Sequence, residues 1–378
     1  MKRRLLILCM AAAMTALLFG CGKKAEEVPD EPVEEEPDEP VQEPDDTEDA
    51  DAIPEGSVKS YLTGEWIDGE LAGKRPYAVM IGNTQDSLPQ YGIGSADVIY
   101  EAPVEASITR LMAIFQDVSG LDKIGSVRSC RHYYIYFAKE FDAIYAHYGQ
   151  SIYAKPILEQ KNVHNISGLD GSIEGIAFYR DKSRKSPHNA FTGGEELLAA
   201  TEKKGYRTDY AESYQGHYQF AKDHEPVELT EGEDALVVSP GYFINKPWFN
   251  YNEDDGLYYR YEFNQKQIDG ATNEQLKVKN IIVQYCNWNM ADENGYLDIK
   301  TIPSDGQGTG KYITNGKMID VTWTKENEDS PARYFDASGN EITLNQGKTW
   351  VCIVRNKYKE RFQVFRTEAE LKEAGAAE

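Results

Sequence analysis

The feature that most restricts the fold is the composition of the first 56 residues, which cannot take part in a packed core. Residues 5–18 are apolar and uncharged, and they follow the basic residues Lys2, Arg3 and Arg4. A run this short predicts a secretory signal peptide, because a membrane-spanning helix needs about 20 apolar residues. Residues 22–56 contain 16 Asp or Glu, six Pro and two Lys, and no aromatic residue. Such a segment cannot bury enough apolar surface to fold, so we expect the fold to begin near residue 57.

The end of the apolar run carries a modification motif. Leu18-Phe19-Gly20-Cys21 matches a bacterial lipobox, in which a diacylglyceryl group is attached to the thiol of the cysteine. Residues 1–21 then form the signal peptide with its lipobox. Lipid on Cys21 would hold the protein in the cell membrane, on its extracytoplasmic face. A plain signal peptide followed by a chance cysteine is the alternative. Residues 22–56 predict an extended stalk, and a tail that binds a basic partner or cations is the alternative reading.

Charge and cysteine content exclude several classes of protein. The formal net charge is −23, of which −12 falls on residues 57–378. An acidic folded part argues against a nucleic acid partner, because phosphate binding needs a basic surface. Cys130, Cys286 and Cys352 are odd in number and far apart, so we expect no disulfide framework. No two histidines have i, i+4 spacing, and no cofactor motif is present, so the sequence predicts neither a metal site nor a cofactor.

The remaining chain divides by its pattern of apolar residues. Residues 57–205 alternate strand-like and helix-like runs, and residues 206–239 are predicted to form a polar connector. Residues 240–366 are rich in strand signals, and residues 367–378 are predicted to form a charged helical tail. We expect a central strand at residues 108–116, a helix at 131–141, a strand at 177–180, and a helix at 151–160. Thr192 and Glu195 predict a capping box that opens a helix ending at Gly205. Asn315-Gly316 predicts a type I′ hairpin. The pattern indicates an α+β protein, with a mixed α/β N-terminal part and a mostly antiparallel C-terminal part.

Candidate binding residues gather in the N-terminal part, at expected strand ends and helix starts. Arginines at such places can hold an anionic group, and histidines there can titrate near neutral pH. The candidate ligand-binding residues are Glu101, Glu105, Arg110, Arg128, Arg131, His147, Arg180, Asp181, Arg184, His188 and Asn189.

Each of these residues also has a structural interpretation. Arg128 and Arg131 could pair with Glu101 and Glu105 and close the core, His147 could be a core histidine, and residues 180–189 could be a solvated basic loop. Cys130, at a helix start, is a further candidate as a nucleophile.

Several motifs in order resemble the YerB lipoprotein family. They are Arg75-Pro-Tyr-Ala-Val-Met-Ile-Gly-Asn83, Ser95-Ala-Asp-Val-Ile-Tyr-Glu-Ala102, Ile124-Gly-Ser-Val-Arg-Ser-Cys-Arg131, Phe141-Asp-Ala-Ile-Tyr-Ala-His147, Gly316-Lys-Met-Ile-Asp-Val-Thr-Trp323 and Asn345-Gln-Gly-Lys-Thr-Trp350. The resemblance covers about residues 60 to 355. It implies a Gram-positive lipoprotein with mixed sheets in a layered β-β-α sandwich, and it implies no established activity.

Three functional hypotheses follow, of which the third is a purely structural or chaperone-like partner for wall synthesis, recognisable by a large exposed apolar patch. The first is a membrane-anchored protein that binds an anionic or carbohydrate component of the cell envelope, or an envelope protein. The second is a hydrolase or transferase acting on cell-wall glycans or phosphodiesters, with Glu101, Glu105 or Asp181 as general acid or base.

Overall fold

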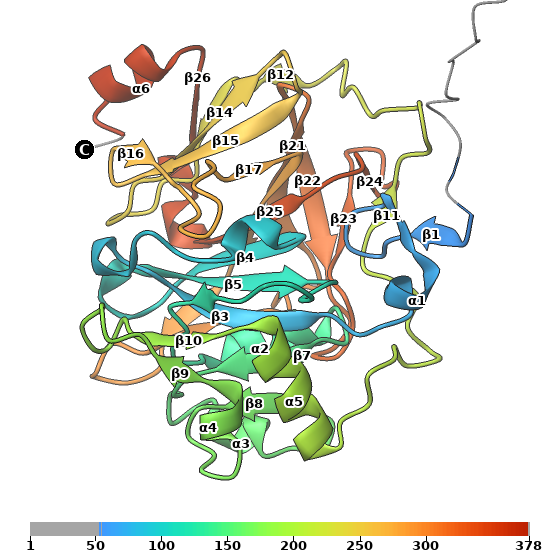
Figure 1. Cartoon of the computed structure of the whole chain (residues 1–378). Helices are drawn as coiled ribbons and strands as arrows, with labels where there is room; N and C mark the ends of the chain where they lie inside the picture. The colour runs from blue at the N-terminus through green and yellow to red at the C-terminus, as the bar shows by residue number, and fades with distance from the viewer. Residues whose placement is uncertain (1–52, 54, 377–378) are drawn as a thin grey trace, which may run out of the picture. The chain divides into compact units, whose positions relative to one another are not determined.

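The computed structural model describes residues 53 and 55–376 (Figure 1). The predicted signal peptide, Cys21 and nearly all of the predicted stalk lie outside the described residues. These assignments therefore stay predictions.

The largest sheet has eleven strands and is mixed parallel and antiparallel. Ten strands follow one another in the order β12-β22-β21-β18-β25-β4-β5-β3-β7-β8, and β23 pairs with β22. Their bounds are β3 Tyr77–Asn83, β4 Val98–Pro103, β5 Thr109–Phe115, β7 Ile144–His147, β8 Asn165–Ser167, β12 Glu233–Asp234, β18 Asn280–Cys286, β21 Gly308–Thr314, β22 Lys317–Thr324, β23 Arg333–Phe335 and β25 Thr349–Arg355.

Strands from both halves of the chain meet in the middle of this sheet. β25 runs parallel to β18 on one side and to β4 on the other, with Cys352 opposite Glu101. β5 lies between β4 and β3, and all seven of its residues are buried, as expected for a central strand. The sheet therefore continues without a break from strands of residues 57–205 to strands of residues 240–366. The domain boundaries expected at residues 205 and 240 stay predictions.

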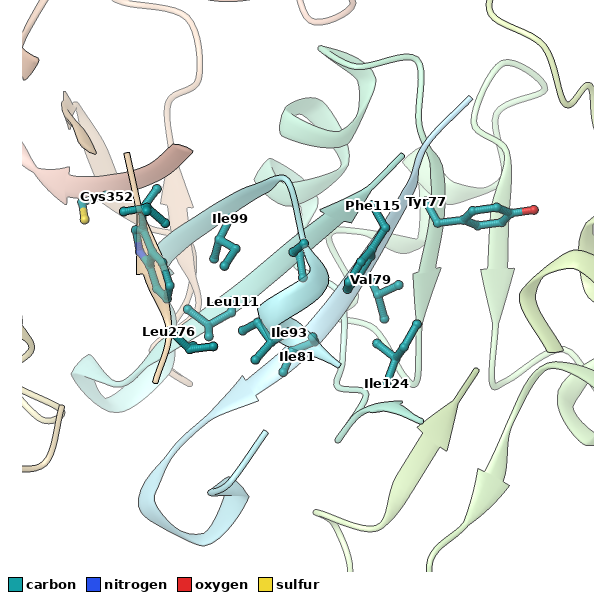
Figure 2. Close-up of a cluster of buried hydrophobic side chains, with 14 of the residues drawn as sticks. Tyr77, Val79, Ile81, Ile93, Ile99, Leu111, Phe115, Ile124, Leu276 and Cys352 are labelled. Atoms are coloured by element: carbon teal, nitrogen blue, oxygen red, sulfur yellow. The ribbon is translucent and has the colours of Figure 1, made fainter. Parts of the chain in front are cut away.

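Alternate residues of the central strands pack on opposite faces of the sheet. Figure 2 shows Val79, Ile81, Ile99, Leu111 and Phe115 on one face, and they belong to a single buried cluster. Their neighbours in the sequence join a second cluster on the other face. Because both faces bury apolar side chains, each must be covered by another layer.

A six-stranded sheet and the helices provide the covering layers. The second sheet has the order β16-β15-β14-β13-β26, and β17 pairs with β15. Its strands are β13 Val237–Ser239, β14 Trp248–Asn252, β15 Leu257–Glu262, β16 Gln265–Lys266, β17 Lys277–Val278 and β26 Gln363–Phe365. Figure 1 shows α2–α5 near β7 and β8, and α6 beside β26. The helices are α1 Gly69–Ala72, α2 His132–Lys139, α3 Lys155–Leu158, α4 Glu174–Ala177, α5 Gly194–Lys204 and α6 Glu368–Glu373.

The remaining elements are small. Four short 3-10 helices cover η1 Gln85–Ser87, η2 Ile93–Ser95, η3 Glu105–Ser107 and η4 Asn356–Arg361. The short sheets consist of β1 Ser57–Lys59 with β2 Trp66–Asp68; β6 Ile124–Gly125, β10 Ala190–Thr192 and β9 Tyr179–Arg180; β11 Gln219–Phe220 with β24 Thr343–Leu344; and β19 Trp288–Met290 with β20 Leu297–Ile299.

The structure confirms the α+β class and the layered, strand-rich arrangement. The predicted hairpin is present, and Asn315 and Gly316 both have the positive φ of a type I′ turn. The predicted capping box is wrong, because Thr192 is the last residue of β10 and Gly193 is the N-cap, without a side-chain hydrogen bond. The helix predicted over residues 151–160 is only the single turn of α3, and α4 replaces the start of the strand predicted at residues 177–180.

Candidate functional site

Three short strands bring two polar segments of the N-terminal half together. β10 pairs with β6 on one side and with β9 on the other, so the loop at residues 181–189 lies beside residues 126–131. The backbone N–H of Val127 donates to the carbonyl of Ala190 at 2.7 Å, next to that loop. Candidate residues from the two segments are therefore close in space.

Four of these residues form what we call the arginine cluster: Arg110, Arg128, Arg184 and His188. Burial lowers the pKa of His188. The positive charges of Arg128, Arg184 and Arg110 lower this pKa further, and the negative charge of Asp86 raises it. The imidazole is therefore neutral at pH 7. Its Nδ1 atom is buried and has no hydrogen-bond partner among the described residues.

The three guanidinium groups of the arginine cluster donate to backbone carbonyls. Arg110 Nη1 donates to Ser129 O at 2.6 Å, Arg128 Nη1 to Pro187 O at 2.7 Å, and Arg184 Nη1 to Pro89 O at 3.1 Å. In the part of the chain that the structure describes, no carboxylate forms an ion pair with any of the three. Burial lowers the pKa of Arg110 to about 10, and Arg131 and Arg128 lower it as well, so the group keeps its charge at neutral pH.

Arg131 differs from the arginine cluster because a carboxylate neutralises it. Its Nε and Nη2 atoms donate to the two oxygens of Glu105 at 2.6 and 2.5 Å, a bidentate geometry. The guanidinium also lies 5.2 Å from the centre of the Tyr296 ring. Of the arginine–glutamate pairs considered from the sequence, the Arg131–Glu105 pair forms. The charge of Arg131 is therefore already balanced within the chain.

Glu101 is fully buried and belongs to the core rather than to the surface loop. It forms an ion pair with Arg260, a residue of β15 in the C-terminal half. Asn83, Thr109 and Asn245 donate to the same carboxylate at 2.8–3.1 Å. Pairing with Arg128 or Arg131 is therefore wrong for this residue, because β4 presents Glu101 to the second sheet.

His147 does not belong to the arginine cluster. Its Nδ1 atom contacts Gly149 O at 2.8 Å, and its Nε2 atom contacts Asn165 Oδ1 at 3.4 Å. The ring is fully buried, and burial lowers its pKa to about 4. Its contacts are those of a neutral core histidine.

Arg180, Asp181 and Asn189 hold the loop together. Arg180 Nη1 donates to Asn189 Oδ1 at 2.9 Å, and its guanidinium lies 4.2 Å from the centre of the Tyr148 ring. Asp181 forms an ion pair with Lys123 at 2.6 Å, which lowers the pKa of the carboxyl well below its usual value. Lys123, which the sequence interpretation missed, is thus a part of the loop's support, and its only sequence signal is its place just before β6.

Cys130 does not have the properties of a nucleophile. It is fully buried, and burial raises the pKa of its thiol to about 12. Its sulfur donates to Arg131 O at 3.3 Å. Because the thiolate is the reactive form, the structure overturns this candidate. Cys286 and Cys352 are also buried and unpaired.

A large pocket of the described structure lies away from the candidate residues. It measures about 670 Å³ and lies at the C-terminal end of α2, with Arg75, His164, Arg207 and Tyr214 among its lining residues. Among residues 53 and 55–376, no group of three or more His, Cys, Asp or Glu is placed to hold a metal ion. In the same residues, no helix combines the length and apolarity needed to cross a bilayer.

Comparison with known proteins places the chain in a family. Residues 62–207 match the family described as "Protein of unknown function (DUF3048) N-terminal domain", and residues 236–351 match its C-terminal domain. "Putative lipoprotein YerB" of Bacillus subtilis (strain 168) is 29% identical over 317 residues, which cover 80% of this chain and 89% of that protein. A crystal structure of the YerB protein from Bacillus subtilis matches with a TM-score of 0.70 and 28% identity, covering 82% of this chain and 100% of that one. The chain therefore belongs to the YerB-like family of proteins of unknown function.

Proposed function

We propose that the protein is a lipid-anchored protein of the cell envelope that binds an anionic envelope component through the arginine cluster. Cys21 would carry the lipid, and the acidic segment at residues 22–56 would hold the folded part on the extracytoplasmic side, away from the membrane surface. The lipobox motif supports the anchor, as does the name of the relative from Bacillus subtilis.

The observation that carries the proposal is the absence of carboxylate partners at Arg110, Arg128 and Arg184, within the residues described. Acidic side chains outnumber basic ones in residues 57–378, 47 to 35, so chance would readily supply such partners. Carbonyl groups fix the three guanidinium groups but do not neutralise them. An anionic ligand would supply the missing charge, and charge-assisted hydrogen bonds contribute about 1.5–3 kcal/mol each.

The hydrolase or transferase hypothesis has less support, because cations already hold its proposed acids and bases. Glu101 is paired with Arg260 in the core, Glu105 with Arg131, and Asp181 with Lys123. A general acid or base must reach the proton that it transfers, whereas each of these three carboxylates is held in an ion pair.

Co-sedimentation with protein-free cell walls of a Gram-positive bacterium tests the proposal. The double substitution Arg128→Gln and Arg184→Gln removes two charges and is expected to weaken binding about 100-fold, or about 1.4 kcal/mol for each arginine. The matched control, Lys182→Gln with Lys185→Gln, removes two charges from exposed positions in the same loop. We expect the control to lose less than about threefold, because exposed charges are screened. Equal binding by the two double variants would contradict the proposal.

A further inference from the structure

A second cationic feature lies in the C-terminal half, at the end of β25. Arg355 is the last residue of this strand, and its side chain is only 6% exposed. Nevertheless, no described residue accepts a hydrogen bond from its guanidinium or forms an ion pair with it. A cation this close to the core normally has a partner in the protein, whereas the nitrogens of Arg355 keep contact with solvent. These donors can therefore be reached by a ligand from outside the chain.

Aromatic rings hold the Arg355 guanidinium in place. Its central carbon lies 4.6 Å from the centre of the Tyr358 ring, 4.7 Å from Trp288 and 5.9 Å from Phe243. The three rings are half-buried. A guanidinium fixed in this way loses little conformational entropy when it binds, and it can accept an oxyanion bidentately.

More cations follow on η4. Lys357, Lys359 and Arg361 are exposed, and among the described residues none of them forms an ion pair with a carboxylate. Arg361 Nε donates to Gly241 O at 2.8 Å, and its guanidinium lies 4.3 Å from the centre of the Phe243 ring. Glu360 is the single acidic residue of η4. This local excess of positive charge stands on a chain whose net charge is −23.

We propose a second binding site, which we call the Arg355 site. It consists of Arg355, the rings of Trp288, Tyr358 and Phe243, and the cations Lys357, Lys359 and Arg361. Its ligand would be an anionic glycan. The carboxylate or phosphate of a sugar unit would accept hydrogen bonds from Arg355, while the apolar face of a sugar ring would pack on Trp288 or Tyr358. The lysines and Arg361 would meet neighbouring charges along the polymer. The rings favour a glycan over an acidic peptide, because they offer flat surfaces beside the cation.

One hairpin lies between the Arg355 site and Arg131, a residue outside the arginine cluster. The hairpin of β19 and β20 carries Trp288, which stacks against Arg355, and its turn carries Tyr296, which lies over Arg131. His132 on α2 contacts Asp298 of β20 at 3.1 Å, which holds the hairpin against the N-terminal half.

Isothermal titration of the mature protein with oligogalacturonate, a carboxylated glycan, tests the Arg355 site. Arg355→Gln is expected to weaken binding at least tenfold, and Trp288→Leu severalfold. Linear polyphosphate offers negative charge without sugar rings, so Trp288→Leu should weaken its binding less than it weakens the binding of oligogalacturonate, while Arg355→Gln should weaken both. Arg366→Gln is the matched control, because Arg366 is exposed and lies outside the site. If Arg355→Gln does not fold, the exposed pair Lys357→Gln and Lys359→Gln should still weaken binding about tenfold.

Several results would overturn the Arg355 site. These are undetectable binding of oligogalacturonate by the wild type, wild-type affinity in the Arg355→Gln variant, equal binding of neutral dextran, or tighter binding of single-stranded DNA. The outcome is separate from that of the arginine cluster, because the substitutions at Arg128 and Arg184 leave Arg355 intact. Loss of binding in only one set of variants would identify which of the two sites acts.

Discussion

Replacement of Glu101 by Gln should destabilise the fold strongly, because it leaves Arg260 as an unpaired charge in the core. Both side chains of this ion pair are 0% exposed. Glu101 also accepts a hydrogen bond from Trp350 Nε1 at 3.3 Å, so the carboxylate is the common acceptor of residues from both halves of the chain. Gln keeps the size of the side chain and one acceptor oxygen, but it removes the negative charge.

The magnitude follows from the burial of the pair. Removal of one partner from a buried ion pair costs about 3–5 kcal/mol, a large part of the 5–15 kcal/mol that stabilises a typical domain. Removal of both partners, as in Glu101→Leu with Arg260→Met, leaves no unpaired charge and should cost less than the single substitution. The contrast between the single and double variants separates the loss of the charge balance from the loss of packing.

Urea unfolding of the mature protein, followed by tryptophan fluorescence and circular dichroism, measures these free energies. Glu105→Gln is the control, because the Glu105–Arg131 pair is partly exposed, with 22% and 9% of the side chains accessible. Solvent can compensate Arg131, so we expect a loss of about 1 kcal/mol there. The reasoning is refuted if Glu101→Gln loses no more free energy of unfolding than Glu105→Gln.

Two further predictions concern pH and backbone conformation. Burial raises the pKa of Glu262 to about 7, so the folded state binds this proton more tightly than the unfolded state, and stability should fall by up to about 3 kcal/mol between pH 5 and pH 8. Glu262→Gln should flatten this dependence in urea midpoints, and an equally steep fall in the variant would count against it. Gly316→Ala should cost about 2 kcal/mol or more, because φ is +72° and the new Cβ would lie 2.9 Å from Tyr251. Gly339→Ala, with φ of +82° and open space around it, should cost only about 1 kcal/mol, and equal thermal shifts in the two variants would exclude the clash as the cause.

Local patterns in the sequence predict features that depend on neighbouring residues. The positions of Thr109–Phe115 are apolar on both faces, and this alone predicts a central strand. The Asn315-Gly316 turn is likewise a property of the two residues, since both tolerate positive φ. The capping box fails for a related reason. Thr192 pairs with Ile124 in the small sheet, and that tertiary contact outweighs the local preference of its side chain for a helix N-terminus.

The candidate site depends on contacts that no local pattern contains. Arg260 is 159 residues from Glu101, and only the pairing of β25 with β4 and the packing of the second sheet bring them together. The sequence makes Arg128 and Arg131 possible partners of Glu101 and Glu105, and of these two arginines only Arg131 has a carboxylate partner, Glu105. Arg355 is the last residue of β25, in which all seven residues are buried. Its role could not be inferred without the rings of Trp288 and Phe243, which come from distant segments.

The distribution of charge limits what the proposed sites can select. The folded part as a whole repels anions, and this repulsion acts over a distance set by the Debye length, about 8 Å at physiological ionic strength. Within that distance, a ligand meets the local field of Arg128 and Arg184, or of Arg355 and η4, rather than the net charge. A single small anion gains one contact, while a polymer with closely spaced charges can occupy several guanidinium groups at once. The charge pattern therefore favours extended anionic ligands over free anions, because only several simultaneous contacts outweigh the repulsion of the whole molecule.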